Sequence, residues 1–387
     1  MRRNRIISVF AATVFFAFSS AAQNESYNAY TPYSMYGIGE ISKQGTTFNK
    51  SMGGIGIATR DKRMLNYLNP AAVTEREKQS FMADFGLASG NRIYYQDQIK
   101  SANNTFSIYD FVISFPVYKS LAMYGGLTPF SDIGYSITSY ETDPSIVGNT
   151  GSITDVAEGY GGLSNLFLGA GVKVFKGMSV GAEVEYVFGG LHKNSTKLFS
   201  KSDFSSIYSG YNIHLNTLVP KVGVQYETPL FSNVTATVGA TYRLATSMRG
   251  TVRDFEYNVV GSVTDTTRII IDTLQNSSRK AKYGDELGIG IALKGGDKWT
   301  AEVNYIRSDW TSCGMDDTGF GVSGNAVFSA TTAQSLRAGF SITPNRNDIR
   351  YYRRRITYRG GAYWDQAYYK LDGNTINTIG LTFGVTL

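Results

Sequence analysis

The sequence predicts an all-β membrane protein, a transmembrane antiparallel β-barrel of about 14 strands with an N-terminal plug inside its lumen. Three observations lead to this prediction. The chain of 387 residues begins with an export signal and contains no later apolar run long enough to span a bilayer as a helix. It is rich in aromatic residues and glycine, with 27 Tyr, 22 Phe and 42 Gly. From Ser80 onward apolar and small polar residues alternate in segments of roughly ten or more residues, which is the length that a tilted strand needs to cross a bilayer.

Residues 1–22 have the pattern of a signal peptide. A basic start at Arg2–Arg5 precedes the apolar run Ile6–Phe18, which is too short for a membrane-spanning helix. Ser20 and Ala22 are small residues at the positions that a signal peptidase requires, so cleavage is expected near Ala22. The signal predicts export, and no cysteine follows it that could carry a lipid anchor.

The composition of the mature chain excludes several classes of site. Loss of three arginines with the signal lowers the formal net charge from +6 to +3, which indicates no nucleic-acid partner. Cys313 is the single cysteine and cannot form an internal disulfide. His192 and His214 are the two histidines, which are too few for a usual zinc site. We therefore expect no metal, no cofactor and no catalytic residue.

Residues 23–79 do not alternate and are expected to form the plug. They contain "SMYGIGE", "SMGGIGIAT" and "LNYLNPAAV", with glycines at turn-like intervals. The segment is too short and too poor in large apolar residues to fold alone. We predict that Asn69, Pro70, Ala71 and Ala72 form a tight turn, in which the Asn69 side chain caps the turn and Pro70 fixes it against the barrel wall.

Residues 80–387 are expected to form the barrel, with apolar side chains facing lipid and small polar side chains facing the lumen. In "LFLGAGVKVFKGMSVGAEVEYVF" we expect Val174 to pair with Val180. This pairing places the apolar side chains of both strands on one face of the sheet. At the end of the chain Asp372-Gly373 is expected to form a two-residue hairpin turn that sets Trp364 opposite Leu381.

Short and long connections alternate along the predicted barrel, as they do when one end faces the periplasm and the other the outside. The short turns are expected at Tyr118–Ser120, Phe175–Gly177, Pro229–Ser232 and Lys294–Lys298. The longer polar segments are expected at Asn91–Asn104, Glu141–Gly162, Lys193–Ser205, Asn276–Gly284 and Thr311–Ala330. The two strands between Phe255 and Thr273 have the weakest alternation.

Two groups of residues stand out on the predicted lumen face. Glu183 and Glu185 project into the lumen, and Lys173 is placed diagonally to Glu183, so we expect these three residues to form lumen ion pairs. "GMSVG" at residues 177–181 matches a nucleophile motif but lies on a hairpin, which is the wrong context for a hydrolase. A hydrolase that uses a wall histidine is the open enzymatic alternative, and we expect no enzyme.

The third predicted strand, "LAMYGGLTPFSDIGYSI", contains Gly125, Gly126 and Pro129. Proline cannot donate to a β-ladder, so Pro129 forces a bulge or leaves a neighbouring carbonyl unpaired. A tolerated bulge near the outer rim is one interpretation. The other is a lateral opening in the wall, lined by Phe130 and Tyr124.

The chain resembles the FadL family of outer-membrane transporters for long-chain fatty acids and other hydrophobic compounds. The resemblance rests on "NPAA" at residues 69–72, on "MGG" at residues 52–54 and on the strand architecture over residues 23–387. It implies a hatch at about residues 23–79, a 14-stranded barrel, substrate capture at the outer face, a hydrophobic site in the lumen and exit through a gap in the wall. The extracellular segments lack the long apolar capture helix of the family.

The expected function is therefore passive transport of hydrophobic small molecules, fatty-acid-like or aromatic, across the outer membrane of a Gram-negative bacterium. One alternative is a FadL-like carrier or scaffold barrel for exported proteins, as in type IX secretion, and another is a porin. The expected partners of this monomer are outer-membrane lipid and lipopolysaccharide, the hydrophobic substrate and the outer-membrane assembly machinery. The alternating terminal strand, residues 379–387, has the pattern of an assembly signal.

Overall fold

The computed structural model describes residues 30–77, 80–96, 99–260, 263–274, 281–315 and 326–387. The predicted signal peptide and its cleavage site near Ala22 lie outside these ranges. The N-terminal elements are η1 (Pro32–Met35), β1 (Glu40–Ile41), α2 (Thr47–Lys50) and η2 (Pro70–Thr74). The strands that follow are β2 (Met82–Gln96), β3 (Ile99–Pro116), β4 (Leu121–Tyr140), β5 (Ile153–Phe175), β6 (Met178–Phe199), β7 (Ser206–Phe231), β8 (Val234–Arg243), β9 (Thr246–Ser247), β10 (Arg249–Val260), β11 (Val263–Thr273), β12 (Lys282–Tyr283), β13 (Asp285–Gly295), β14 (Trp299–Asp309), β15 (Phe328–Ala330), β16 (Thr332–Ile342), β17 (Thr357–Leu371) and β18 (Asn374–Thr386). Two short helices, α3 (Pro144–Thr150) and α4 (Tyr352–Arg355), lie in connections.

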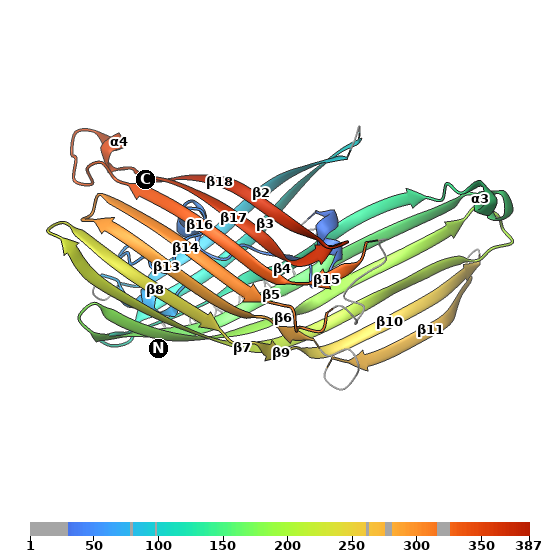
Figure 1. The fold of residues 1–387 in the computed structure, drawn as a ribbon, viewed down its shortest axis with the longest axis horizontal. Coiled ribbons are helices and arrows are strands. Elements are labelled where there is room, and N and C mark those ends of the chain that lie inside the picture. Colours follow the sequence, from blue (N-terminus) through green and yellow to red (C-terminus); the bar gives the residue numbers. More distant parts are fainter. Residues whose placement is uncertain (1–29, 78–79, 97–98, 261–262, 275–280, 316–325) are drawn as a thin grey trace, which may run out of the picture.

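One large antiparallel sheet makes up most of the molecule, and it curls around the N-terminal segment (Figure 1). The sheet has 16 strands, and its long strands follow one another in the order β18-β17-β16-β14-β13-β8-β7-β6-β5-β4-β3-β2. The predicted all-β fold class is confirmed. In the part of the chain that the structure describes, no pairing joins β18 to β2. No helix there has the length and apolar character needed to cross a membrane.

The expected number of about 14 strands includes two weak strands. Among the described residues, fourteen strands of the large sheet have ten or more residues, and twelve of them follow one another around the wall. The two weak strands between Phe255 and Thr273 belong to β10 and β11, and β10 pairs with β7 beyond the point where β8 ends. They therefore extend the wall lengthwise and do not widen it.

The two faces of the wall differ in the way that the alternation predicts. On the outer face Leu166, Leu168 and Val184 are 49%, 58% and 51% exposed. On the inner face Phe167 and Glu183 are both 3% exposed. The apolar outer face forms the band that contacts lipid, and the inner face packs against the N-terminal segment.

The short turns lie together at one end of the sheet, which we call the short-turn end, and this is the end at which α4 and the C-terminus lie in Figure 1. The predicted registers are displaced by two residues. Val180 pairs with Val172, and Trp364 pairs with Ile379. In β17 an irregularity between Gln366 and Lys370 shifts the pairing by two residues. In the β5–β6 hairpin a two-residue turn and a one-residue bulge replace the longer turn that was expected. A shift of two keeps the same side chains on each face. The turn at Asp372-Gly373 has positive φ angles of 50° and 77°, as a two-residue hairpin requires.

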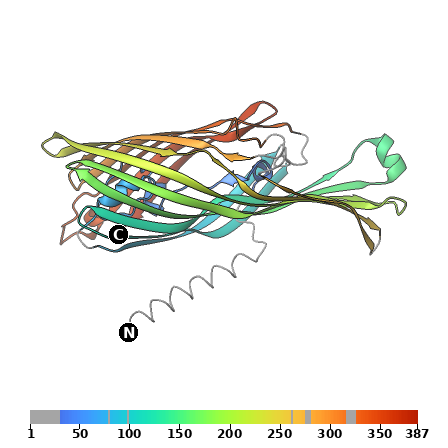
Figure 2. The same cartoon turned by 90° about the horizontal axis from the view of Figure 1, so that it is seen from below.

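At the opposite end, the long-loop end, several predicted polar connections are strands. Asn91–Asn104 is the paired end of β2 and β3, and β6 continues through the predicted loop to Phe199. Strands β4–β7 with β10 and β11 extend beyond the rest of the wall, with α3 at the tip (Figure 2). The predicted connections Asn276–Gly284 and Thr311–Ala330 fall partly outside the described residues.

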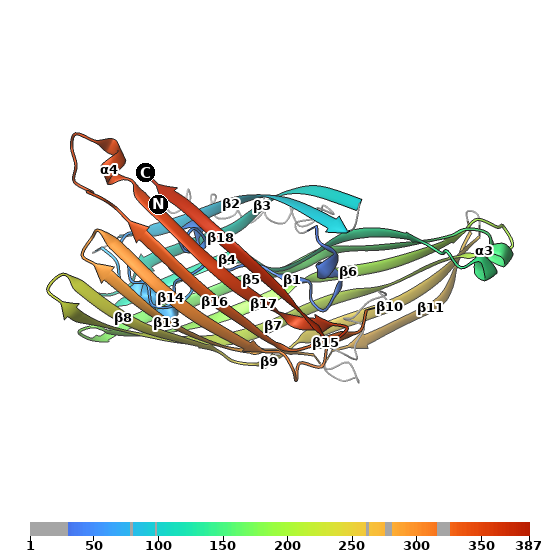
Figure 3. The same ribbon diagram turned by 45° about the horizontal axis from the view of Figure 1, so that its top comes forward.

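The N-terminal segment, residues 30–77, lies inside the curled sheet (Figure 3). Ile38, Met52, Ile55 and Asn69 are all fully buried. Its side chains cap its own short helices. Thr31 accepts a hydrogen bond from the Tyr33 N–H at the start of η1, and the Asn49 side chain accepts one from the Thr46 N–H beside α2. These caps satisfy backbone groups that would otherwise be buried without partners.

Candidate functional site

The Asn-Pro-Ala-Ala turn lies where the N-terminal segment meets the wall. Asn69 occupies the N-cap of η2, and its Oδ1 accepts a hydrogen bond of 3.0 Å from the Ala71 N–H. Its Nδ2 donates to the carbonyl oxygens of Ile57 at 2.7 Å and of Val224, on β7, at 3.2 Å. One amide group thus ties the turn to its own segment and to the wall.

Glycines in the wall make room for this turn. A Cβ at Gly171 or Gly181 would lie 2.6 Å from the Pro70 carbonyl oxygen, and a Cβ at Gly223 would lie 2.8 Å from Pro70 Cδ. These glycines are on the adjacent strands β5, β6 and β7. The small inner face therefore serves as a docking surface for the Pro70 backbone, because a larger residue at any of the three positions would displace it.

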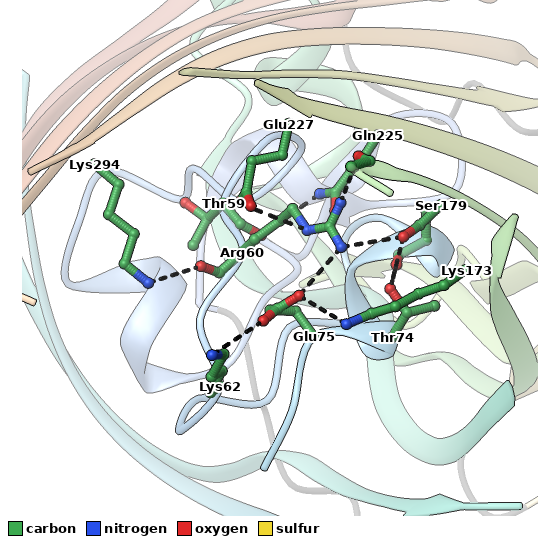
Figure 4. Close-up of polar contacts among 12 residues, drawn as sticks. Thr59, Arg60, Lys62, Thr74, Glu75, Lys173, Ser179, Gln225, Glu227 and Lys294 are labelled. Carbon is green, nitrogen blue, oxygen red and sulfur yellow. Dashed lines mark hydrogen bonds and ion pairs between the residues drawn. The ribbon is translucent and has the colours of Figure 1, made fainter. Parts of the chain in front are cut away.

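A polar cluster holds the segment at the short-turn end (Figure 4). The Arg60 Nη2 lies 3.2 Å from Glu75 Oε2 and donates to Ser179 Oγ at 3.1 Å. Its Nη1 donates to the Gly177 carbonyl at 3.1 Å. The Lys173 Nζ lies 3.1 Å from Glu75 Oε2. Because Glu75 binds Lys173, the predicted pairing of Lys173 with Glu183 is wrong.

Protonation of Glu75 should loosen this cluster. Burial acts to raise the pKa of Glu75, but the ion pairs with Lys173, Arg60 and Lys62 outweigh burial and hold the pKa below its ordinary value. Its stabilising contribution is therefore present above the unfolded-state pKa of about 4.3 and is lost as the pH falls through the folded-state pKa. We expect hydrogen-exchange protection of residues 60–75 to fall below about pH 4 in the wild type and to be low and nearly pH-independent in Glu75→Gln. The same pH dependence in both proteins would contradict this assignment.

A cavity of about 690 Å³ lies between the N-terminal segment and the wall. A row of aromatic rings, Phe130, Tyr283, Trp310 and Tyr368, lines one part of it. Successive ring centroids in this row are 5.3, 5.1 and 5.1 Å apart. Such a row offers a continuous apolar surface to a ligand.

The wall formed by β6, β7, β8 and β13 brings buried charges to the same cavity. The Lys221 Nζ lies 3.1 Å from Glu183 Oε1 and 3.7 Å from Glu185 Oε1. Arg243 lies 3.5 Å from Glu185 and 3.0 Å from Glu286. Tyr124, on β4, also donates a hydrogen bond to Glu183. The two glutamates expected in the lumen thus pair with Lys221 and Arg243.

The β3–β4 ladder ends partway along the wall. Pairing stops at Phe111 with Leu127, and the β2–β3 hairpin turns away from β4 toward the long-loop end (Figures 1 and 3). Tyr124, Gly125 and Gly126 lie in the paired part, which corrects their predicted place at a lateral opening. Gly126 has a packing role there, because a Cβ would lie 2.6 Å from the Phe111 carbonyl oxygen. Pro129 and Phe130 lie beyond the end of the ladder, and the register with β5 shifts at Pro129.

The N-terminal segment occupies the edge of β4 that β3 leaves free. Residues Glu40 and Ile41 of β1 pair with Asp132 and Ser131. Gln44 Nε2 donates to the Pro129 carbonyl at 2.9 Å. On the other side Glu40 forms an ion pair with Arg92 of β2, and the Tyr94 hydroxyl donates to the Tyr30 carbonyl at 2.8 Å. The segment thus bridges β2 and β4, and Gln44, Arg92 and Phe130 also line the cavity.

Sequence reasoning missed the wall residues that hold the segment. Glu302, on β14, accepts hydrogen bonds from the Gly56 N–H at 3.1 Å, from the Ala58 N–H at 2.8 Å and from the Thr59 hydroxyl. Gln225, on β7, donates to the Ile57 carbonyl at 2.9 Å. In the sequence, Glu302 and Gln225 are recognisable only as polar residues at inner-face positions of their strands. Alternation alone does not show whether such a residue contacts the N-terminal segment or faces water.

Solved structures of outer-membrane channels share this fold. The toluene transporter TbuX of Ralstonia pickettii is 14% identical, over 88% of this chain and 89% of that chain, with a TM-score of 0.54. The toluene transporter TodX of P. putida is 12% identical, over 84% of each chain, with a TM-score of 0.52. A Pseudomonas aeruginosa FadL homologue is 12% identical, over 85% of this chain and 81% of that chain, with a TM-score of 0.52. The predicted resemblance to the FadL family is thereby confirmed at the level of the fold.

Comparison with curated proteins finds no match. A family model described as BamG matches residues 1–387, the whole chain. Proteins with the FadL fold and proteins of this family lie in the outer membrane, which confirms the predicted location. The chain is therefore an outer-membrane β-barrel protein that belongs to the BamG family and has the FadL fold.

Proposed function

We propose that this protein is a passive outer-membrane transporter for hydrophobic small molecules and that residues 30–77 act as its hatch. The observation that carries the proposal is the cavity of about 690 Å³ with its row of aromatic rings, which reaches the place where β3 and β4 separate. The toluene transporters with the same fold support the substrate class. With the short-turn end in the periplasm, a molecule enters at the long-loop end, binds beside the hatch and leaves sideways past Pro129 and Phe130.

Such transport needs no catalytic residue, cofactor or chemical energy source. An apolar molecule gains about 0.8 kcal/mol for each methylene group that it buries in the bilayer. The protein must only provide an open path from the outside, through the cavity, to the bilayer. In this proposal the hatch strand β1 is the movable part. Its two residue pairs with β4 and the adjoining hydrogen bonds of Ser42 to Phe130 and of Gln44 to Pro129 must open for exit.

A second candidate function is support of outer-membrane assembly through contacts with other exported proteins. The BamG family match favours it, and so does the sheet of β4–β7, β10 and β11 that extends beyond the wall (Figure 2). This function would use the extended sheet as a docking surface and would leave the cavity unused. A porin is disfavoured because the N-terminal segment occupies the lumen.

Mass spectrometry of molecules that co-purify with the folded protein tests the transport proposal. We expect apolar or amphipathic molecules, extracted at near-stoichiometric amounts from wild-type protein. Substitution of Phe130 and Trp310 by alanine removes two rings of the row, so co-purification should fall in this variant. An equal recovery from wild type and variant would show that the molecules are bound elsewhere.

A further inference from the structure

The connection between β16 and β17, residues 343–356, differs from the other connections at the short-turn end, and we call it the basic loop. Within the described part of the chain the others at this end have four residues or fewer, whereas the basic loop is longer and contains α4 (Figure 1). Five arginines and one aspartate give it a formal charge of +4. This exceeds the net charge of +3 expected for the whole mature chain, so the basic character of the protein is concentrated here.

Internal hydrogen bonds give the basic loop a defined shape. Asp348 Oδ1 accepts hydrogen bonds from the Arg350 N–H at 2.9 Å and from the Tyr351 N–H at 2.8 Å. Asp348 Oδ2 lies 3.2 Å from Arg354 Nη1. Nearer the wall the Asn345 N–H donates to the Arg354 carbonyl at 2.7 Å. The one carboxylate side chain of the loop therefore holds the loop together, and most of the arginine charge is left without a counterion inside it.

Three arginines of the basic loop present their charge to the surroundings. Arg350, Arg353 and Arg355 are exposed, and among the described residues none of them forms an ion pair. The guanidinium carbon of Arg350 lies 5.4 Å from the centroid of the Tyr351 ring, and that of Arg355 lies 4.8 Å from the centroid of the Tyr352 ring. Contact with a ring orients a guanidinium group and leaves its N–H edge free to donate. Exposed guanidinium groups of this kind are suited to bind phosphate oxygens.

The basic loop is attached to the lipid-contacting side of the wall. The Tyr358 hydroxyl donates to the Arg353 carbonyl at 3.2 Å. Tyr358 lies on the outer face between Ile342 of β16 and Val385 of β18, which are 40% and 59% exposed. Ile349, in the loop itself, is 99% exposed. Arginines beside tyrosine rings at the end of an apolar band are typical of a membrane interface, so these features favour a lipid headgroup over a soluble acidic protein.

We propose that the basic loop binds the phosphate groups of anionic phospholipids in the leaflet next to the short-turn end, with Arg350, Arg353 and Arg355 as the donors. The exposed Ile349 side chain contacts the same lipids. Charge complementarity carries the proposal, because clustered arginines beside a membrane attract anionic headgroups. The site lies outside the cavity and is independent of the proposed transport. An acidic periplasmic protein is the competing partner.

Native mass spectrometry of the delipidated, full-length mature protein in non-ionic detergent tests the proposal. The probes are phosphatidylglycerol and phosphatidylcholine with identical acyl chains, which differ in headgroup charge, and a decaglutamate peptide. In the wild type we expect phosphatidylglycerol to bind at least about tenfold more tightly than phosphatidylcholine. The triple variant Arg350→Gln, Arg353→Gln, Arg355→Gln should lose this preference. The triple variant with lysine at the same positions keeps the charge and should retain at least about a third of it.

A matched control removes three charges elsewhere. Arg249, Arg253 and Arg307 are exposed arginines of β10 and β14, and their joint replacement by glutamine should leave the preference at the wild-type value. The wild-type preference should also fall at least about threefold between about 0.1 and 0.5 M ammonium acetate, because salt screens exposed charges. This second measurement needs no variant.

Each other outcome overturns the lipid site and leaves the transport proposal untouched. Equal binding of the two lipids by the wild type, a preference that salt does not change, or an undiminished preference in the glutamine variant would show that the arginines select no headgroup. Loss of the preference in the lysine variant or in the control would assign it to the shape of the loop or to the net charge of the protein. Tighter binding of decaglutamate than of phosphatidylglycerol, abolished in the glutamine variant, would assign the basic loop to an acidic protein.

Discussion

Removal of residues 27–75 is expected to convert the protein into an open channel. The N-terminal segment fills the lumen and bridges β2 and β4, so its loss leaves an aqueous path inside a wall of twelve long strands. In proteoliposomes, entry of small polar dyes should rise on the order of tenfold or more, because barrels wider than about eight strands leave a channel when nothing fills them. The measurement is dye entry at equal amounts of inserted protein.

A point variant separates hatch release from general damage. Glu302→Ala removes one carboxylate that accepts hydrogen bonds from Gly56, Ala58 and Thr59. Leaving these buried donors without a partner costs about 1–3 kcal/mol each, which is enough to free this part of the segment. We therefore expect partial dye entry with Glu302→Ala and none with the control Glu256→Gln, which changes the extended sheet.

Two results would contradict this account of the hatch. The first is a deletion variant that inserts and excludes dyes as well as the wild type does. The second is a Glu302→Ala variant in which hydrogen exchange of residues 56–59 is unchanged. Either result would mean that the segment does not close the lumen.

The sequence predicted those features that depend on local pattern. Period-two alternation assigns the outer and inner faces correctly, because each strand contacts lipid on one face throughout its length. The Asp372-Gly373 turn follows from residues that tolerate positive φ. The Asn69-Pro70 turn was also placed against the barrel wall from residue types, although the wall glycines that it contacts were not predicted.

Features that depend on contacts between distant residues could not be predicted. The displaced registers arise from an irregularity in β17 that changes the pairing by two residues, and from a short turn and a one-residue bulge between β5 and β6. In both hairpins the same side chains stay on each face. Lys173 has the sequence spacing of a diagonal partner of Glu183, but in the structure it forms its ion pair with Glu75 of the N-terminal segment. Alternation cannot reveal a partner that comes from a segment without alternation.

The residues predicted to line a lateral opening also depend on contacts between distant residues. Pro129 was correctly singled out as a break in a ladder, but the neighbouring glycines were assigned to the break when they pack inside the paired region. A glycine that permits close packing and a glycine that interrupts a strand look the same in one sequence. The structure separates them by showing what a Cβ would meet.

Movement of β1 away from β4 is the central step of the proposed transport, and a disulfide can prevent it. Ile41 and Ser131 are directly opposite in an antiparallel pair, a geometry whose Cα separation permits a disulfide. The variant Ile41→Cys with Ser131→Cys is made together with Cys313→Ser, which removes the one native cysteine. Oxidation then fixes the hatch across the place where β3 and β4 separate.

A matched disulfide controls for oxidation itself. Lys370 and Thr375 are opposite one another on β17 and β18, so Lys370→Cys with Thr375→Cys joins two wall strands without touching the N-terminal segment. Both variants are measured reduced and oxidised. Reduction should restore any activity that the hatch disulfide removes.

The decisive measurement is the initial rate of radiolabelled ethylbenzene uptake by cells in which this protein is the main route for hydrophobic solutes. With the Ile41–Ser131 disulfide formed, the rate should fall at least about tenfold, which corresponds to about 1.4 kcal/mol added to the exit barrier. The reduced protein and the oxidised Lys370–Thr375 control should take up ethylbenzene at the wild-type rate. Undiminished uptake by the oxidised hatch variant would contradict exit past Pro129 and, with it, the proposed route.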